Sequence, residues 1–103
     1  MKKLTLALIF LIVPLFADEV PDQDLDVPYE PSHPKVVEAM IKAAAVTGQD
    51  TLFDLGCGDG RIVIAAAKLG ARAIGYDIDE QRLMEARERA HVAGVESKVE
   101  FRR

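Results

Sequence analysis

The stretch DLGCGDGRIVIAAAKLGARAIGYD, residues 54–77, decides the fold of this chain. It joins a glycine-rich loop at 54–60 to a run of alanines and branched apolar residues, and it ends on a β-rich run that closes at Asp77. A short apolar run at 51–55 precedes the loop. The pattern therefore predicts a strand at 51–55, a helix at about 60–69 and a second strand at about 72–77. Two strands joined by such a helix form a right-handed crossover in a parallel sheet.

The flanking sequence continues the same alternation. Apolar residues at spacings of three and four predict a helix at about 34–46, in which Pro34 fits the first turn. After the second strand, Asp79 can cap a third helix that Gly94 closes, and residues 98–102 read as a third strand. The order predicts an α/β fold: the first half of a Rossmann-like doubly wound parallel sheet, with about three strands and three helices.

Length and charge narrow the possible functions. A chain of 103 residues with one cysteine holds one small domain at most and is no disulfide scaffold. The formal net charge of -4 gives no basic stripe for a nucleic-acid backbone, so nucleic acid is an unlikely partner on this ground.

The glycine loop lies where open α/β sheets bind ligands, at the carboxyl end of a strand and the start of a helix. It is not a dinucleotide fingerprint, because Arg61 stands where the third glycine of G-x-G-x-x-G belongs, and the chain has no phosphate-binding P-loop. Asp77 closes the second strand and can accept hydrogen bonds from ribose hydroxyls. The constellation therefore favours a nucleoside without a pyrophosphate.

At these residues the chain resembles a known family. DLGCGDGRIVIAAAK followed by GYDID is similar to the class I S-adenosylmethionine-dependent methyltransferases, a resemblance that covers residues 28–103. The segment VPYEPS at 27–32 resembles the same region of protein-lysine methyltransferases related to the mitochondrial ATP-synthase c-subunit enzyme. The resemblance implies S-adenosylmethionine as cofactor and a methyl acceptor that is a protein lysine or a small molecule.

The resemblance also implies a set of cofactor-binding residues. Gly56 and Gly58 would line the methionine part, and Asp54 would orient the loop and the cofactor's amino group. Asp77 would hold the ribose and Ile78 would pack on the adenine. Tyr29 and Ser32 would close over the cofactor.

Simpler interpretations stand beside these roles. Asp54 could accept only backbone N–H groups of its own turn, and Asp59 could be only a charge at a helix N-terminus. Tyr29 and Ser32 could be ordinary linker residues. For Asp54 and Asp77 we favour the functional interpretation, because a carboxylate at the end of a buried strand otherwise costs desolvation.

Other residues have no predicted role in ligand binding or catalysis. We expect Gly60 to pack a helix, Asp79 to cap one, and Cys57 to be a small buried side chain. His33 and His91 have no partner at metal-ligand spacing, so no metal site is predicted.

The first 17 residues predict export. Lys2 and Lys3 precede an apolar run at 4–16, the pattern of a signal peptide or, if uncleaved, of an inner-membrane anchor. Residues 18–33 are a linker rich in proline and acid, and 34–103 form the methyltransferase-like part. The expected location is periplasmic or secreted, or membrane-anchored through residues 4–16.

Catalytic residues are unknown from this sequence, because the acceptor-facing groups of the family follow a fourth strand of the fold. We therefore expect an incomplete, inactive fragment that leaves the far edge of the first predicted strand and one face of the sheet open. The alternative is a secreted, non-catalytic nucleoside-binding or interaction protein on the same half-fold.

Overall fold

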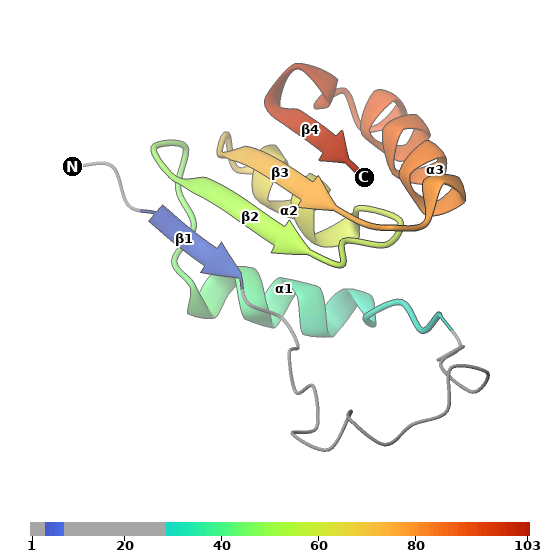
Figure 1. Cartoon of the computed structure of the whole chain (residues 1–103). Helices are drawn as coiled ribbons and strands as arrows, with labels where there is room; N and C mark the ends of the chain where they lie inside the picture. The colour runs from blue at the N-terminus through green and yellow to red at the C-terminus, as the bar shows by residue number, and fades with distance from the viewer. Residues whose placement is uncertain (1–3, 8–28) are drawn as a thin grey trace.

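Parallel strands form a single sheet in the computed structural model, which describes residues 4–7 and 29–103 (Figure 1). The strands lie side by side in the order β1 (Leu4–Ala7), β2 (Thr51–Leu55), β3 (Arg72–Tyr76) and β4 (Val99–Arg102). The helices are α1 (Pro34–Ala43), α2 (Arg61–Lys68) and α3 (Glu80–Val92), with a short 3₁₀ helix η2 (Glu96–Lys98). The predicted α/β fold is confirmed.

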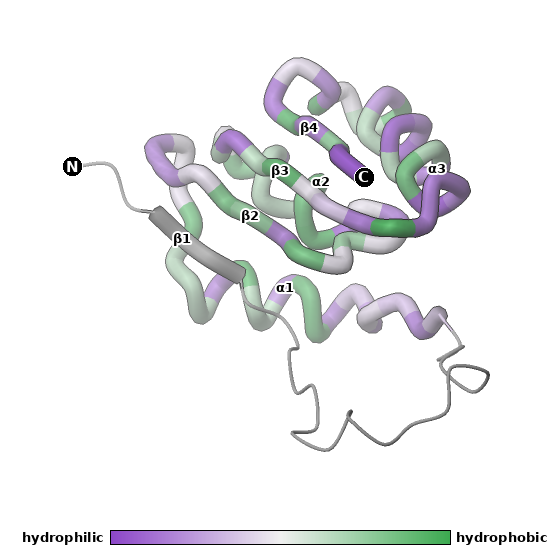
Figure 2. The backbone as a smooth tube through the Cα atoms, viewed as in Figure 1, coloured by the Kyte–Doolittle hydropathy of each residue, from purple (hydrophilic) through white to green (hydrophobic). Residues whose placement is uncertain are grey.

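All three α-helices cover the same side of the sheet (Figure 1), as right-handed crossovers in one direction require. Leu52 of β2 and Ala73 of β3 point into this layer, where they meet buried residues from each helix. In Figure 2 most of β2 is hydrophobic and β3 is hydrophobic in its middle, whereas α3 mixes hydrophilic and hydrophobic segments. The core therefore lies between the sheet and α2, with α1 and α3 closing its sides. Its buried valine, leucine, isoleucine and phenylalanine members are Val37, Ile41, Val46, Leu52, Ile62, Val63, Ile64, Leu83, Val95 and Phe101.

The helix boundaries differ from the prediction at one place that matters. The first helix ends at Ala43 rather than at about residue 46, and Ala45 takes a left-handed φ of 50°. Val36 is exposed, whereas Val37 and Ile41 are buried. The apolar periodicity located the helix but included one residue of the wrong face.

The far edge of β2 is not open, so this part of the prediction was wrong for the structure. Leu4–Ala7 pair in parallel with Thr51–Asp54 and form the edge strand β1. This strand falls inside the apolar run that the sequence assigns to a leader. Residues 1–3 and 8–28, which hold the rest of that leader and most of the linker, lie outside the described residues. Export and anchoring stay predictions, and no described helix is long and apolar enough to cross a membrane.

The sheet face opposite the helices carries no helix among the described residues (Figure 1). Side chains alternate along a strand, so Phe53 and Leu55 of β2 point to this face. Beside them, Arg102 reaches both Glu100, at 2.7 Å, and the Tyr76 hydroxyl, at 3.1 Å. The described part of this face is therefore half apolar and half polar.

Candidate cofactor site

The glycine loop is tied to the end of the neighbouring strand. The backbone N–H groups of Gly56 and Cys57 both donate to the carbonyl oxygen of Tyr76, at 2.7 and 2.9 Å. Gly56 and Gly58 have φ angles of 83° and 54°, a region that glycine adopts without the steric cost of a Cβ. The loop can make this turn between β2 and α2 because glycines stand at these two positions.

Asp77 bridges the glycine loop and the start of α3. Its Oδ2 accepts from the N–H of Gly58 at 2.8 Å, and its Oδ1 accepts from the N–H of Asp79 at 2.8 Å. The structure thus brings Asp77 beside Gly58. Each carboxylate oxygen can accept more than one hydrogen bond, so Asp77 keeps capacity for further donors.

Asp54 is buried in the same place without a comparable set of partners. It is 2% exposed, and its Oδ2 has no hydrogen-bond partner among the described residues. Burial, with a smaller contribution from the charge of Asp77, raises the pKa of Asp54 to about 6. A buried carboxylate oxygen without a donor is costly. The simpler interpretation, in which Asp54 serves only its own turn, leaves this oxygen unexplained.

A cavity of about 270 Å³ lies between the glycine loop and residues 29–32. A Cβ built on Gly56 would meet nothing within 4 Å, so that side of the loop is open. A Cβ built on Gly58 would lie 2.6 Å from Cε2 of Tyr29, so an aromatic ring already fills that side. The cavity is lined by Tyr29, Glu30, Pro31, Ser32, Asp54, Gly56, Cys57, Gly58, Asp59, Arg61 and Ile62.

Residues 29–33, which we call the strap, cross the outside of the loop. The Tyr29 hydroxyl accepts from the N–H of Asp59 at 3.2 Å, and the Ser32 carbonyl accepts from Nη1 of Arg61 at 2.7 Å. Tyr29 and Ser32 therefore close over the loop rather than behaving as free linker, and Ser32 does so through its backbone. Ile78 is 88% exposed beyond Asp77, which leaves its side chain available to a ligand.

Asp59 has a structural role that the sequence did not reveal. It is 5% exposed, and its carboxylate is bound by Arg61 through Nε at 3.0 Å and Nη2 at 2.7 Å. Arg89 of α3 approaches to 3.6 Å. Burial raises the pKa of Asp59, but the hydrogen bonds and charge of Arg61, with Arg89, outweigh it and hold that pKa below its usual range. The D-x-R spacing was the available signal, because it lets the first residue of α2 fold back on the loop.

Gly60, Asp79 and Cys57 have the structural roles that the sequence suggested. Gly60 packs α2 against its neighbours, since a Cβ there would lie 2.8 Å from the ring of Phe101. Asp79 caps α3 by accepting from the N–H of Gln81 at 3.0 Å. Burial, with the charges of Asp54 and Asp77, raises the pKa of the Cys57 thiol to about 12, so it is a poor nucleophile. Residues 29–103 contain no cluster of metal-ligating side chains.

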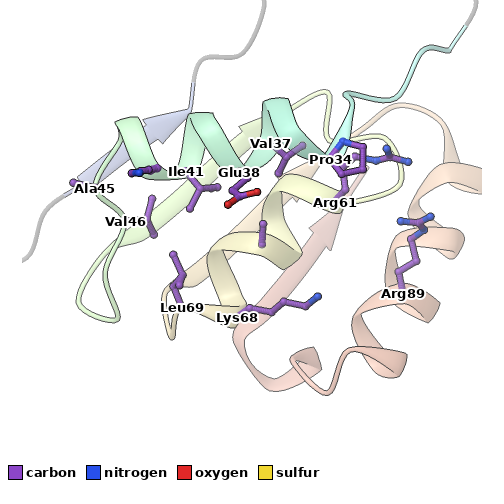
Figure 3. Close-up of a pocket in the computed structure, with 12 residues that line it drawn as sticks. Pro34, Val37, Glu38, Ile41, Ala45, Val46, Arg61, Lys68, Leu69 and Arg89 are labelled. Carbon is purple, nitrogen blue, oxygen red and sulfur yellow. The ribbon is translucent and has the colours of Figure 1, made fainter.

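A larger groove of about 750 Å³ runs along the helix layer, away from the strand ends (Figure 3). Arg61 and Arg89 stand at one end of it and Val46 toward the other (Figure 3). Arg61 is the one residue that it shares with the cavity over the glycine loop. The groove therefore holds neither Asp54 nor Asp77 and is not the nucleoside site.

The chain is similar in sequence to known methyltransferases. Residues 54–103 match the model of the ANTKMT methyltransferase domain. A protein-lysine N-methyltransferase of Saccharolobus islandicus is 48% identical over 62 residues, which cover 58% of this chain and 38% of that protein. The human lysine N-methyltransferase of the ATP-synthase c-subunit is 39% identical over 74 residues, which cover 72% of this chain and 31% of that protein. The chain spans about a third of the length of these curated relatives.

A solved structure agrees in both fold and sequence. The RNA methyltransferase from Salinibacter ruber, in complex with S-adenosyl-L-homocysteine, superposes with a TM-score of 0.70 at 47% identity. The match covers 72% of this chain and 49% of that one. The ligand of that protein is the demethylated form of the cofactor predicted here. The predicted resemblance is confirmed: the chain has the first half of a Rossmann-like S-adenosylmethionine-dependent methyltransferase fold and is similar in sequence to protein-lysine methyltransferases.

Proposed function

We propose that this chain supplies the S-adenosylmethionine-binding half of a methyltransferase that modifies a protein lysine. One observation carries the proposal. A buried carboxylate oxygen of Asp54, without a donor among the described residues, lines a cavity beside the open face of Gly56. A ligand that brings a positively charged donor into that cavity would satisfy the oxygen and relieve its desolvation cost.

The site residues fit S-adenosylmethionine part by part. The ammonium of its methionine portion is the charged donor that Asp54 lacks, and Gly56 leaves room for that portion against the backbone. Asp77 would accept from the ribose hydroxyls, and the exposed side chain of Ile78 would pack on the adenine. Tyr29 would shield the far side. When bound, this cofactor supplies a methyl group on a sulfonium sulfur, which an amine can displace.

The choice of lysine as acceptor rests on the relatives. Both curated relatives described above are named as lysine methyltransferases of proteins. The similar solved structure is named as an RNA methyltransferase, which makes RNA the competing acceptor despite the net charge of -4. Because this half is expected to be inactive alone, the test incubates the methyltransferase that contains it together with an acceptor-binding half with methyl-labelled cofactor, protein and RNA. We expect labelled methyl-lysine, and label only in RNA would contradict the lysine assignment.

The cofactor proposal is tested by calorimetric titration of S-adenosylhomocysteine into the full chain. Asp77→Asn keeps an oxygen that can accept from Gly58 but removes the charge, so we expect affinity to fall by roughly tenfold or more. Glu88→Gln, an equal change of charge on the exposed surface of α3, is the matched control and should leave affinity unchanged. A folded chain that binds nothing, or an Asp77→Asn chain that binds normally, would contradict the proposal.

A second candidate function follows from the apolar run at 4–16 behind Lys2 and Lys3. We also propose that this run directs the chain out of the cytoplasm or anchors it at the inner membrane. If so, an exported, non-catalytic nucleoside-binding protein competes with the methyltransferase. Cell fractionation with amino-terminal sequencing tests the location, and the methyl-transfer assay above tests the chemistry.

A further inference from the structure

Arg82 of α3 lies against the outer face of the strap. Its guanidinium carbon is 4.1 Å from the centre of the Tyr29 ring, a stacked cation–π arrangement. The same ring lies against Gly58, where a Cβ would come within 2.6 Å of Cε2, and its hydroxyl accepts from the N–H of Asp59. Tyr29 is therefore held between α3 and the glycine loop.

The arginine side chain is itself fixed in this position. Its Nη1 donates to both carboxylate oxygens of Glu85, at 3.0 and 2.9 Å, and its Nε lies 3.9 Å from Oδ2 of Asp79. The side chain is 28% exposed. Nη1 is thus held by Glu85, whereas Nε is buried without a hydrogen-bond partner among the described residues, and the guanidinium lies over the Tyr29 ring.

These contacts also connect Arg82 and Tyr29 to Asp77, the candidate ribose-binding residue. Asp79 donates its N–H to Asp77, and Asp77 accepts from the N–H of Gly58, the residue under Tyr29. The strap is thus connected to Asp77 by two routes, one through the glycine loop and one through α3. A shift of Arg82 would loosen the second route and leave the first intact.

We propose that Arg82 is a positioning residue that clamps Tyr29 onto the glycine loop and so slows the departure of a bound cofactor. The clamping is a property of the chain alone, whereas its effect on the cofactor rests on the proposed function. The competing role for Arg82 is an ordinary i, i+3 ion pair with Glu85 on the surface of α3, which contributes little by itself.

The first test needs no cofactor. Amide hydrogen exchange of the full chain reports the bond from Asp59 to the Tyr29 hydroxyl, and the Gly60 amide, bound to the Cys57 carbonyl, is the internal reference. We expect Arg82→Ala to speed exchange at Asp59 by roughly three- to tenfold, the factor of an ordinary cation–π contact, with Gly60 unchanged. Equal acceleration at Gly60, or none at Asp59, would overturn the clamp.

The second test is a double-mutant cycle on the affinity for S-adenosylhomocysteine. Arg82→Ala should weaken binding roughly three- to tenfold with Tyr29 present and not at all in a Tyr29→Ala background. Arg82→Lys, which keeps a cation without the flat guanidinium, should fall between. Arg87→Ala, which removes the exposed pair with Glu80 on the same helix, is the matched control and should not change affinity.

The two tests fail in different ways. If no variant or wild-type chain binds the homocysteine while Asp59 still depends on Arg82 for protection, the proposed function fails and the clamp stands. If binding is normal and the losses from Arg82→Ala and Tyr29→Ala simply add, the clamp is wrong and the proposed function stands.

Discussion

The two halves of the glycine loop are built in opposite ways. The first half, Asp54 to Gly56, which we call the open half, faces the cavity with a carboxylate oxygen that no described donor meets. The second half, Gly58 to Asp59, the filled half, is covered by Tyr29 and neutralised by Arg61. Both halves belong to one short motif at the end of β2, yet Asp54 has an oxygen without a described donor, whereas Asp59 is paired with Arg61 and Arg89.

The difference shows how to separate a structural acid from one that serves a ligand. Both Asp54 and Asp59 are almost completely buried. For Asp59 the cations of Arg61 and Arg89 outweigh burial and lower the pKa, whereas for Asp54 burial dominates and the nearest charge, Asp77, adds to it. A buried acid with a raised pKa, an oxygen without a donor among the described residues and a cavity beside it is a candidate for a ligand contact.

The largest expected effect comes from breaking the filled half. Asp59→Ala would leave Arg61 without its bidentate partner beside a buried site, so we expect a loss of about 3 kcal/mol in the free energy of unfolding. Chemical denaturation at pH 7 measures it. A loss within the few tenths of a kcal/mol typical of surface changes would show that the pair is incidental.

The stability of the protein should also depend on pH through Asp54 in the open half, whose pKa is raised rather than lowered. The pKa of Asp54 is raised to about 6 in the folded chain, so the folded state binds a proton more tightly than the unfolded one. The free energy of unfolding therefore falls as pH rises from about 4 through 6 and is nearly level above about pH 7, with a loss of about 3 kcal/mol in total. Asp54→Asn should remove that slope when both chains are unfolded chemically at pH 4 and 7. If the free energy of unfolding changed with pH equally in both chains, the pH dependence would not come from Asp54.

The smallest effect compares the two glycines. Alanine at either position costs about 1 kcal/mol because of the positive φ. At Gly58 the new methyl group would also displace the Tyr29 ring, so only Gly58→Ala should expose the Asp59 amide to fast exchange. If Gly56→Ala disturbed that amide equally, the division of the loop into two halves would be wrong.

The sequence predicted most of the fold and part of the site, for physical reasons that can be named. The strands and α-helices from 34 to 102 follow from apolar periodicity, whereas Asp54, Gly56 and Asp77 were proposed as site residues from the glycine motif and the family resemblance that it carries. The edge strand at Leu4–Ala7 was not predicted, because a short apolar run has the same composition in a leader and in a strand. The contacts of Arg82 with Tyr29 and of Arg89 with Asp59 were not predicted either, since they depend on how α3 packs.

The central claim is that Asp54 in the open half binds the ammonium group of the cofactor. Titrating S-adenosylhomocysteine into the full chain at pH 5 and pH 7.5 tests it most directly. Only the ionised form of Asp54 offers the charge, so the wild-type chain should bind about tenfold more weakly at pH 5. Asp54→Asn should bind weakly at both pH values. Tight binding by Asp54→Asn, or the same dependence on pH in both chains, would contradict the account.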